Sequence, residues 1–245
     1  YYHRLDKIIR EHGTEGSYCG HSSVGLMHIR PGINLKMESE IEKMISIQEQ
    51  TADLVLEFGG AMSGEHGDGL ARSHLIPKFF GPKLNNAFRE VKRVFDPEGL
   101  MNPGKIVDGD PFTDNFRISP TYKTVPIPTI MDFSSDGGFA RAIEMCNGVG
   151  ACRKRDGTMC PSFQVTNEEE HSTRGRANAL REVISGGIEG EDLSSKRLYE
   201  VMDLCLACKG CKAECPSSVD MAKIKAEGMQ AHWDSHGTPA RARLF

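Results

Sequence analysis

Four cysteines near the end of the chain have a spacing that can hold an iron–sulfur cluster. They follow the pattern C-x2-C-x2-C-x3-C-P at Cys205, Cys208, Cys211 and Cys215. The two-residue spacing lets three thiolates bind one face of a cubane cluster, and the cysteine before proline typically binds a different cluster. A zinc site more often uses two separated cysteine pairs. The spacing therefore predicts a centre for one-electron transfer.

A second cysteine block lies upstream and lacks its middle cysteine. It contains Cys146, Cys152 and Cys160, with Val149 where the middle thiolate is expected. If the last cysteine of each block crosses to the other site, one site receives four thiolates and suits a [4Fe–4S] cube: Cys160, Cys205, Cys208 and Cys211. The other receives three: Cys146, Cys152 and Cys215. Three thiolates suit a [3Fe–4S] cluster or a cube with an outside ligand; alternatively, this site has no cluster and its cysteines are buried apolar residues or free thiols.

The first part of the chain contains a different set of potential ligands. His21 and His28 flank a turn that contains Gly25, and Glu65 and His66 lie in a glycine-rich loop. Two imidazoles and one carboxylate commonly bind a divalent metal, and exposed loops often carry functional groups. The spacing alone indicates a candidate metal site.

The motifs around these residues resemble a known family. The pattern G-H-x3-G-x2-H is followed by G-E-H-G-x-G and by FDPEGLMNPGK at residues 95–105. Residues 1–107 thereby resemble the C-terminal half of the FAD-linked oxidases, in the subgroup of D-2-hydroxyacid dehydrogenases that act on D-lactate or D-2-hydroxyglutarate. The cysteine-rich region resembles the alpha-helical ferredoxin modules of respiratory dehydrogenases. Its three-cysteine site is similar to the three-iron site in the iron–sulfur subunits of succinate dehydrogenase and fumarate reductase.

The resemblance implies roles for individual residues. His21, His28 and Glu65 would bind zinc or manganese, and His66 would be the general base, which is a usual role for histidine at neutral pH. Arg30 would bind a substrate carboxylate through its guanidinium fork, although a solvated arginine explains it equally well. The chain departs from the family after His21, where relatives often have G-D-G-N.

Three further residues have weaker implied roles. Arg72 is a second candidate for substrate binding, with the same solvated alternative. Asn102 and Lys105 are candidates to approach the flavin, although a turn that ends a helix explains them nearly as well. A glycine-rich FAD-binding segment is not recognisable in this sequence. We therefore expect the flavin domain to precede Tyr1, and we expect this fragment alone to be inactive.

The implied activity is oxidation of a D-2-hydroxyacid to a 2-oxo acid, with electrons passing from FAD to the cluster or clusters. The final acceptor would be a quinone, a cytochrome or another electron carrier. One alternative is an electron-transfer subunit or scaffold without its own substrate site. Another is a zinc-binding interaction module.

The elements that must position these residues indicate an α+β fold class. We expect a truncated substrate and metal domain at residues 1–120, a proline-rich linker at 121–136, and a mainly helical iron–sulfur domain at 137–245. Apolar periodicity predicts helices over 2–12, 38–58, 82–95, 138–146, 168–186, 195–204 and 219–233, with two strands within 17–36.

Composition limits the other function classes. The 245 residues include 38% hydrophobic and 26% charged residues, with a net charge of −4. This balance argues against disorder and against a nucleic-acid-binding surface. We see neither a membrane span nor a signal pattern, and seven of the eight cysteines lie in a cluster. A reducing, cytoplasmic location is therefore expected, with peripheral association at the inner membrane as an option.

Overall fold

The computed structural model describes residues 1–114 and 116–244, and the chain divides into two compact units at residues 1–122 and 123–245. The first unit combines helices with a two-stranded antiparallel sheet. The second unit contains helices, with no strand among the residues described there. The α+β fold class expected from the sequence is confirmed.

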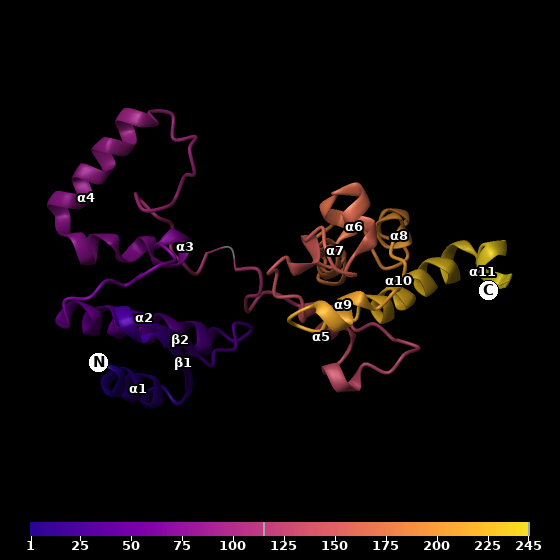
Figure 1. The fold of residues 1–245 in the computed structure, drawn as a ribbon, viewed down its shortest axis with the longest axis horizontal. Helices are drawn as coiled ribbons and strands as arrows, with labels where there is room; N and C mark the ends of the chain where they lie inside the picture. The colour runs from indigo at the N-terminus through magenta and orange to yellow at the C-terminus, as the bar shows by residue number, and fades with distance from the viewer. Residues whose placement is uncertain (115, 245) are drawn as a thin grey trace. The chain divides into compact units, whose positions relative to one another are not determined.

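The first unit is built around a β-hairpin and two helices that pack together (Figure 1). Its elements begin with α1 (Tyr2–Glu11), β1 (Gly16–His21), β2 (Leu26–Pro31) and α2 (Glu38–Glu57). Leu5 and Ile9 lie four residues apart, so both project from one face of α1. They are fully buried against Ile47 and Leu54 of α2. This apolar cluster supports one face of the hairpin and leaves the other face available for a site.

The rest of the first unit carries the glycine-rich loop and a long, kinked helix. After the loop come α3 (Gly69–Arg72), the short 3-10 helix η2 (Ser73–Leu75) and α4 (Ile76–Phe95). The prediction of a helix at 82–95 covered only the second part of α4. Gly81 has a left-handed φ of 71° immediately before Pro82, so α4 is two helical segments joined at a kink. The sequence pattern identified only the segment after the proline.

The second unit is a set of helices around one apolar core. These helices are α5 (Phe139–Glu144), α6 (Pro161–Thr166), α7 (Thr173–Ile184), α8 (Lys196–Asp203), α9 (Gly210–Glu214), α10 (Met221–His236) and α11 (Ala240–Leu244). The longer ones correspond to the predicted helices, but α7 begins five residues later than expected. The chain before it forms a 3-10 turn, η5 (Glu169–His171).

The core of the second unit includes Ile143, Leu180, Met202 and Ile224, which are almost fully buried. Several cysteines belong to the same cluster of buried side chains, whereas Cys208 is exposed, so the cysteine sites extend from the core to the surface. Among the described residues, no helix is both long and apolar enough to span a membrane.

Candidate metal centre and iron–sulfur cavities

The register of the hairpin places the two predicted histidine ligands on one face. Cys19 is opposite His28 and His21 is opposite Leu26, so the two histidines are diagonal neighbours. Side chains alternate along a strand, which directs Tyr18 to the opposite, core face. The His21 and His28 rings lie 5.5 Å apart, measured between centroids. Gly25, with a left-handed φ of 65°, helps to close the turn between the strands.

A close contact brings the glutamate loop onto the same face. A Cβ atom on Gly64 would lie 2.0 Å from Cδ1 of Leu26, so only glycine allows this approach without displacing the leucine. Leu26 lies beside the two histidines in the hairpin register. The loop therefore packs on the hairpin at the point where the next residue, Glu65, meets the imidazoles.

The carboxylate of Glu65 lies among three imidazoles. One oxygen is 3.0 Å from Nε2 of His28 and 3.2 Å from Nε2 of His66, and the other is 3.6 Å from Nε2 of His21. Each of His21, His28 and Glu65 offers one potential ligand atom, and these three atoms lie within 4.8 Å of one another. The donor set and its convergence suit zinc or manganese. His66 adjoins the three ligands, and its side chain is 66% exposed.

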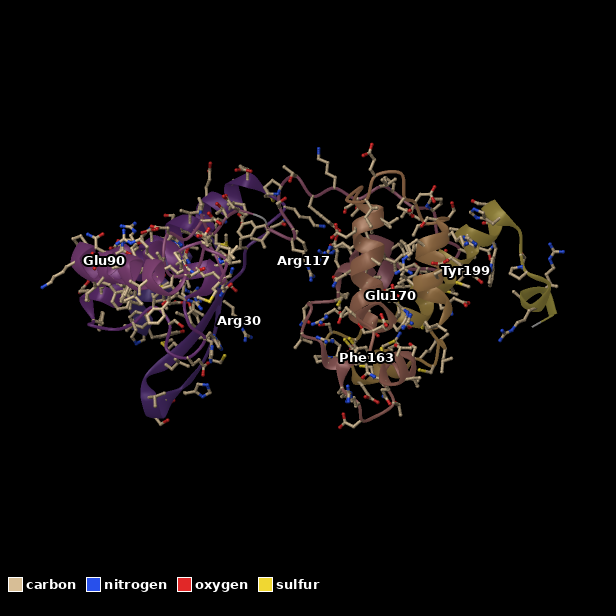
Figure 2. The ribbon with its side chains drawn as sticks, turned by 90° about the horizontal axis from the view of Figure 1, so that it is seen from above. Arg30, Glu90, Arg117, Phe163, Glu170 and Tyr199 are labelled. Atoms are coloured by element: carbon tan, nitrogen blue, oxygen red, sulfur yellow. The ribbon has the colours of Figure 1, made fainter. Side chains whose placement is uncertain are left out.

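A cavity of about 530 Å³ opens beside this cluster in the first unit. Its lining includes His28, Glu65 and His66 together with both predicted substrate arginines, Arg30 and Arg72. Arg30 is two residues beyond His28 on the same strand face and extends outward into solvent (Figure 2). The arrangement combines candidate metal ligands, a candidate base and guanidinium groups at one opening.

The remaining predicted residues have different environments. Arg72 donates a hydrogen bond to the backbone oxygen of Gly67 and lies 3.9 Å from the carboxylate of Asp68, so it also stabilises the glycine loop. Asn102 and Lys105 do not line the cavity beside His28. Asn102 has a left-handed φ of 49°, and Lys105 donates to a backbone oxygen two residues earlier. The structure does not bring these two residues together with the candidate metal ligands.

In the second unit, four cysteines line one cavity in the crossed arrangement expected from the two blocks. They are Cys160, Cys205, Cys208 and Cys211. Cys160 has a left-handed φ of 53° where α6 begins, and Ala207 and Lys209 are also left-handed. These conformations turn the chain sharply around the thiols. No disulfide joins any of the described cysteines, so four sulfur donors are available for a cube.

The other three cysteines line a separate cavity. Cys146 and Cys152 are 8% and 4% exposed, and Cys215 reaches this cavity from the second block. Val149 also lines it and is 64% exposed. The site therefore offers three sulfur donors and an accessible valine in place of a fourth. Three sulfur donors are the number that a [3Fe–4S] cluster takes from its protein.

The N-terminus of α7 lies between the two cavities, and Thr173 lines both. Its backbone N–H donates to Sγ of Cys160 at 3.1 Å, and the next N–H, from Arg174, donates to Sγ of Cys152 at 3.3 Å. A hydrogen bond from the Cys160 thiol lowers the pKa of Cys152 to about 6, against the effect of burial. One helix end thus contacts one thiol from each site, and amide donors at a helix N-terminus favour thiolates.

Two residues at these cavities were missed from the sequence. Thr173 lines both cavities. Arg176, one turn further along α7, lines the four-cysteine cavity. The run Ser-Thr-Arg-Gly-Arg at 172–176 offered a signal, because serine is a common N-cap and arginine is unusual in a buried helix face. The structure shows Ser172 as the N-cap, accepting the N–H of Gly175 at 2.9 Å.

Comparison with known proteins agrees with this two-part organisation. The family model described as FAD linked oxidases, C-terminal domain, matches residues 1–106, and the 4Fe-4S dicluster domain matches residues 142–219. The chain is 30% identical to D-2-hydroxyglutarate dehydrogenases of Haemophilus influenzae and Pseudomonas putida, over 97% of this chain and 26% and 27% of those relatives. A D-lactate dehydrogenase of Archaeoglobus fulgidus is 31% identical over 44% of this chain and 23% of the relative. No solved structure matches significantly.

The two long alignments cover both units, and the chain spans about a quarter of the length of the relatives. The alignment with the D-lactate dehydrogenase is limited to 107 residues. Residues 1–106 therefore belong to the C-terminal domain family of the FAD-linked oxidases, and residues 142–219 belong to the 4Fe-4S dicluster domain family.

Proposed function

We propose that this chain provides the substrate-side metal site and the iron–sulfur relay for flavin-dependent oxidation of a D-2-hydroxyacid to a 2-oxo acid. The observation that carries the proposal is the convergence of His21, His28 and Glu65, with His66 beside them, at a cavity that also contains Arg30. The related D-2-hydroxyglutarate and D-lactate dehydrogenases support this substrate class.

The residues of the chain have distinct roles in this proposal. Arg30 binds the substrate carboxylate through its guanidinium fork and orients the hydroxyl-bearing carbon. His66 accepts the hydroxyl proton on its imidazole ring, which lies beside Glu65. A zinc or manganese ion held by His21, His28 and Glu65 would supply Lewis-acid stabilisation of the deprotonated hydroxyl. Arg72 lines the same cavity, and its hydrogen bond to Gly67 stabilises the glycine-rich loop that carries His66.

When bound, FAD would supply the acceptor for the hydride. We assign most of the FAD-binding residues to protein outside this chain. The predicted roles of Asn102 and Lys105 at the flavin remain part of this proposal. Both belong to the loop that follows α4, which is attached to the body of the unit by the hydrogen bond from Ile106 N–H to Ser73 Oγ at 2.7 Å. This attachment gives the loop a defined position from which to contact a flavin.

The test uses the full-length protein with Glu65→Gln and His66→Asn, and with Glu11→Gln and His3→Asn at exposed positions of α1 as matched controls. We expect Glu65→Gln to lose the divalent metal and His66→Asn to slow substrate-dependent flavin bleaching by roughly 10²–10⁴-fold. The two control variants should retain the divalent metal and the wild-type rate of flavin bleaching.

Iron and acid-labile sulfide are measured in the same samples. Unaffected hydroxyacid oxidation in both site variants, with intact clusters, would instead support an electron-transfer scaffold without its own substrate site. A preparation with zinc but neither iron nor sulfide would support the interaction-module alternative.

We also propose a [4Fe–4S] cube in the four-cysteine cavity and a [3Fe–4S] cluster in the three-cysteine cavity. The support is the thiol count of each cavity and the contact of both sites with Thr173. This contact gives electrons a short route between the sites. Anaerobic preparations should contain about seven irons and about eight sulfides per chain. About four irons and four sulfides would contradict the second cluster.

The electron acceptor in this proposal is a quinone, a cytochrome or another electron carrier, and the location is cytoplasmic with peripheral association at the inner membrane. Free thiols at all eight cysteines are consistent with a reducing compartment. Fractionation of cells, with the protein assayed in soluble and salt-washed membrane fractions, tests the location. Recovery only from the periplasm would contradict it.

A further inference from the structure

The four-cysteine cavity has a buried positive charge in its wall. Arg176 of α7 is 1% exposed and is the largest fully buried side chain of the described residues. It lines the cavity together with the four thiols. A buried guanidinium is costly unless a negative group compensates it, so its partners are informative.

The direct partners of Arg176 are all neutral. Its guanidinium donates to the backbone oxygens of Val201 and His171 and to the hydroxyl of Ser162. Within the part of the chain that the structure describes, no carboxylate forms an ion pair with it. The hydrogen bonds hold the group in place, but they do not neutralise its charge.

The thiolates supply the missing negative charge. Burial lowers the pKa of Arg176, and the charges of Cys205, Cys160 and Cys211 oppose that effect. A cube held by four thiolates carries a net negative charge, which increases when one electron enters. A nearby cation in a low-dielectric core favours the more negative state. The arginine should therefore stabilise the reduced cluster more than the oxidised one.

We propose that Arg176 is a positioning residue that sets the reduction potential of the cube at Cys160, Cys205, Cys208 and Cys211, by holding a positive charge that no carboxylate pairs with against its thiolates. In the reaction concerned, one electron from the reduced flavin enters the cluster, without proton transfer and without a change in its covalent ligands. The positive charge raises the potential and makes the cube a better acceptor.

This inference rests on the proposed cube but not on the hydroxyacid chemistry. The experiment is an anaerobic redox titration of the full-length holoprotein, with dithionite as reductant and the EPR signal of the reduced cube as readout. The variants are Arg176→Met, Arg176→Gln and Arg176→Lys. Arg181→Met is the matched control, because Arg181 is also buried on α7 but is paired with Glu182 at 2.8 Å.

We expect both neutral variants to shift the midpoint of the cube to more negative potential, while Arg176→Lys and Arg181→Met remain near the wild-type value. A neutral variant with full iron and sulfide content and an unchanged midpoint would overturn the inference. If neither neutral variant assembles the cube but Arg176→Lys does, the requirement for charge is supported. If Arg176→Lys also fails to assemble it, the residue has a structural role and the inference is rejected.

Absence of iron and sulfide from the wild-type protein would refute the proposed cube itself. That result is distinct from an unchanged midpoint in a loaded variant, and it leaves the metal site of the first unit unaffected.

Discussion

Replacing Val149 with cysteine should convert the three-thiol site into a four-thiol site. Val149 lines the same cavity as Cys146, Cys152 and Cys215 and stands where the spacing of the first block expects a thiolate. Its side chain is 64% exposed, so the change creates neither a buried void nor a steric clash in the core. The variant adds a sulfur donor where the cavity lacks one.

The size of the effect follows from the thiol count. Wild-type protein with a cube and a three-iron cluster contains about seven irons and about eight sulfides per chain, whereas two cubes contain about eight of each. Val149→Cys should therefore raise iron by about one per chain and leave sulfide unchanged. In EPR, the signal of an oxidised three-iron cluster should disappear, and a second signal should appear after reduction.

The matched control is Val125→Cys, because Val125 belongs to the same unit, is 62% exposed and does not line the cavity. This variant adds an accessible thiol without adding a ligand, so its iron content and spectra should match the wild type. If Val149→Cys leaves iron and both EPR signals unchanged while the wild type contains a three-iron cluster, position 149 is not the missing ligand position. The crossed assignment at this site would then be wrong.

Three further predictions concern the groups that stabilise the two units. Ser172→Ala removes the buried N-cap of α7 and should reduce the free energy of unfolding by about 1–2 kcal/mol in an anaerobic denaturant titration; an unchanged midpoint would contradict the capping role. Glu227→Gln weakens two hydrogen bonds from backbone N–H groups to a buried carboxylate and should cost roughly 1.5–3 kcal/mol in the same assay; a cost near zero would refute this. The Lys92 side chain lowers the pKa of Asp96 below its ordinary 3.8, so the stability from this carboxylate is present above that value and is lost as pH falls through the folded-state pKa. Hydrogen exchange should show weaker protection of the Leu100 amide, which donates to Asp96 at 2.9 Å, in acid than at neutral pH; protection that does not change with pH would exclude this linkage.

Local patterns predicted much of the secondary structure. They failed where tertiary contacts determine the residue at which a helix begins. The apolar spacing of α1 and α2 is a property of the helix itself, so it can be read from the chain. The start of α7 is different. The chain at 169–171 forms a 3-10 turn because its backbone packs closely against Gly175, where a Cβ atom would lie 2.0 Å from the oxygen of Glu169. Periodicity carries no information about that contact.

The same division applies to the sites. Residue types and spacing were sufficient to single out the seven clustered cysteines and the candidate metal ligands, because several thiols or imidazoles at short intervals are typical of metal sites. How these residues meet depended on long-range packing. His21 and Glu65 are brought together by the contact of Gly64 with Leu26, which no local pattern encodes.

The sequence by itself determined the kinds of donor in this protein and their number: four thiols and three thiols, and two histidines with a carboxylate. Only the tertiary structure decided what surrounds them. The α7 helix places Thr173 between both cysteine cavities and Arg176, with neutral partners, in the wall of one. The physical reason is that ligand spacing reflects local chain geometry, whereas the charge around a cluster depends on elements that are distant in sequence and are packed together by the core.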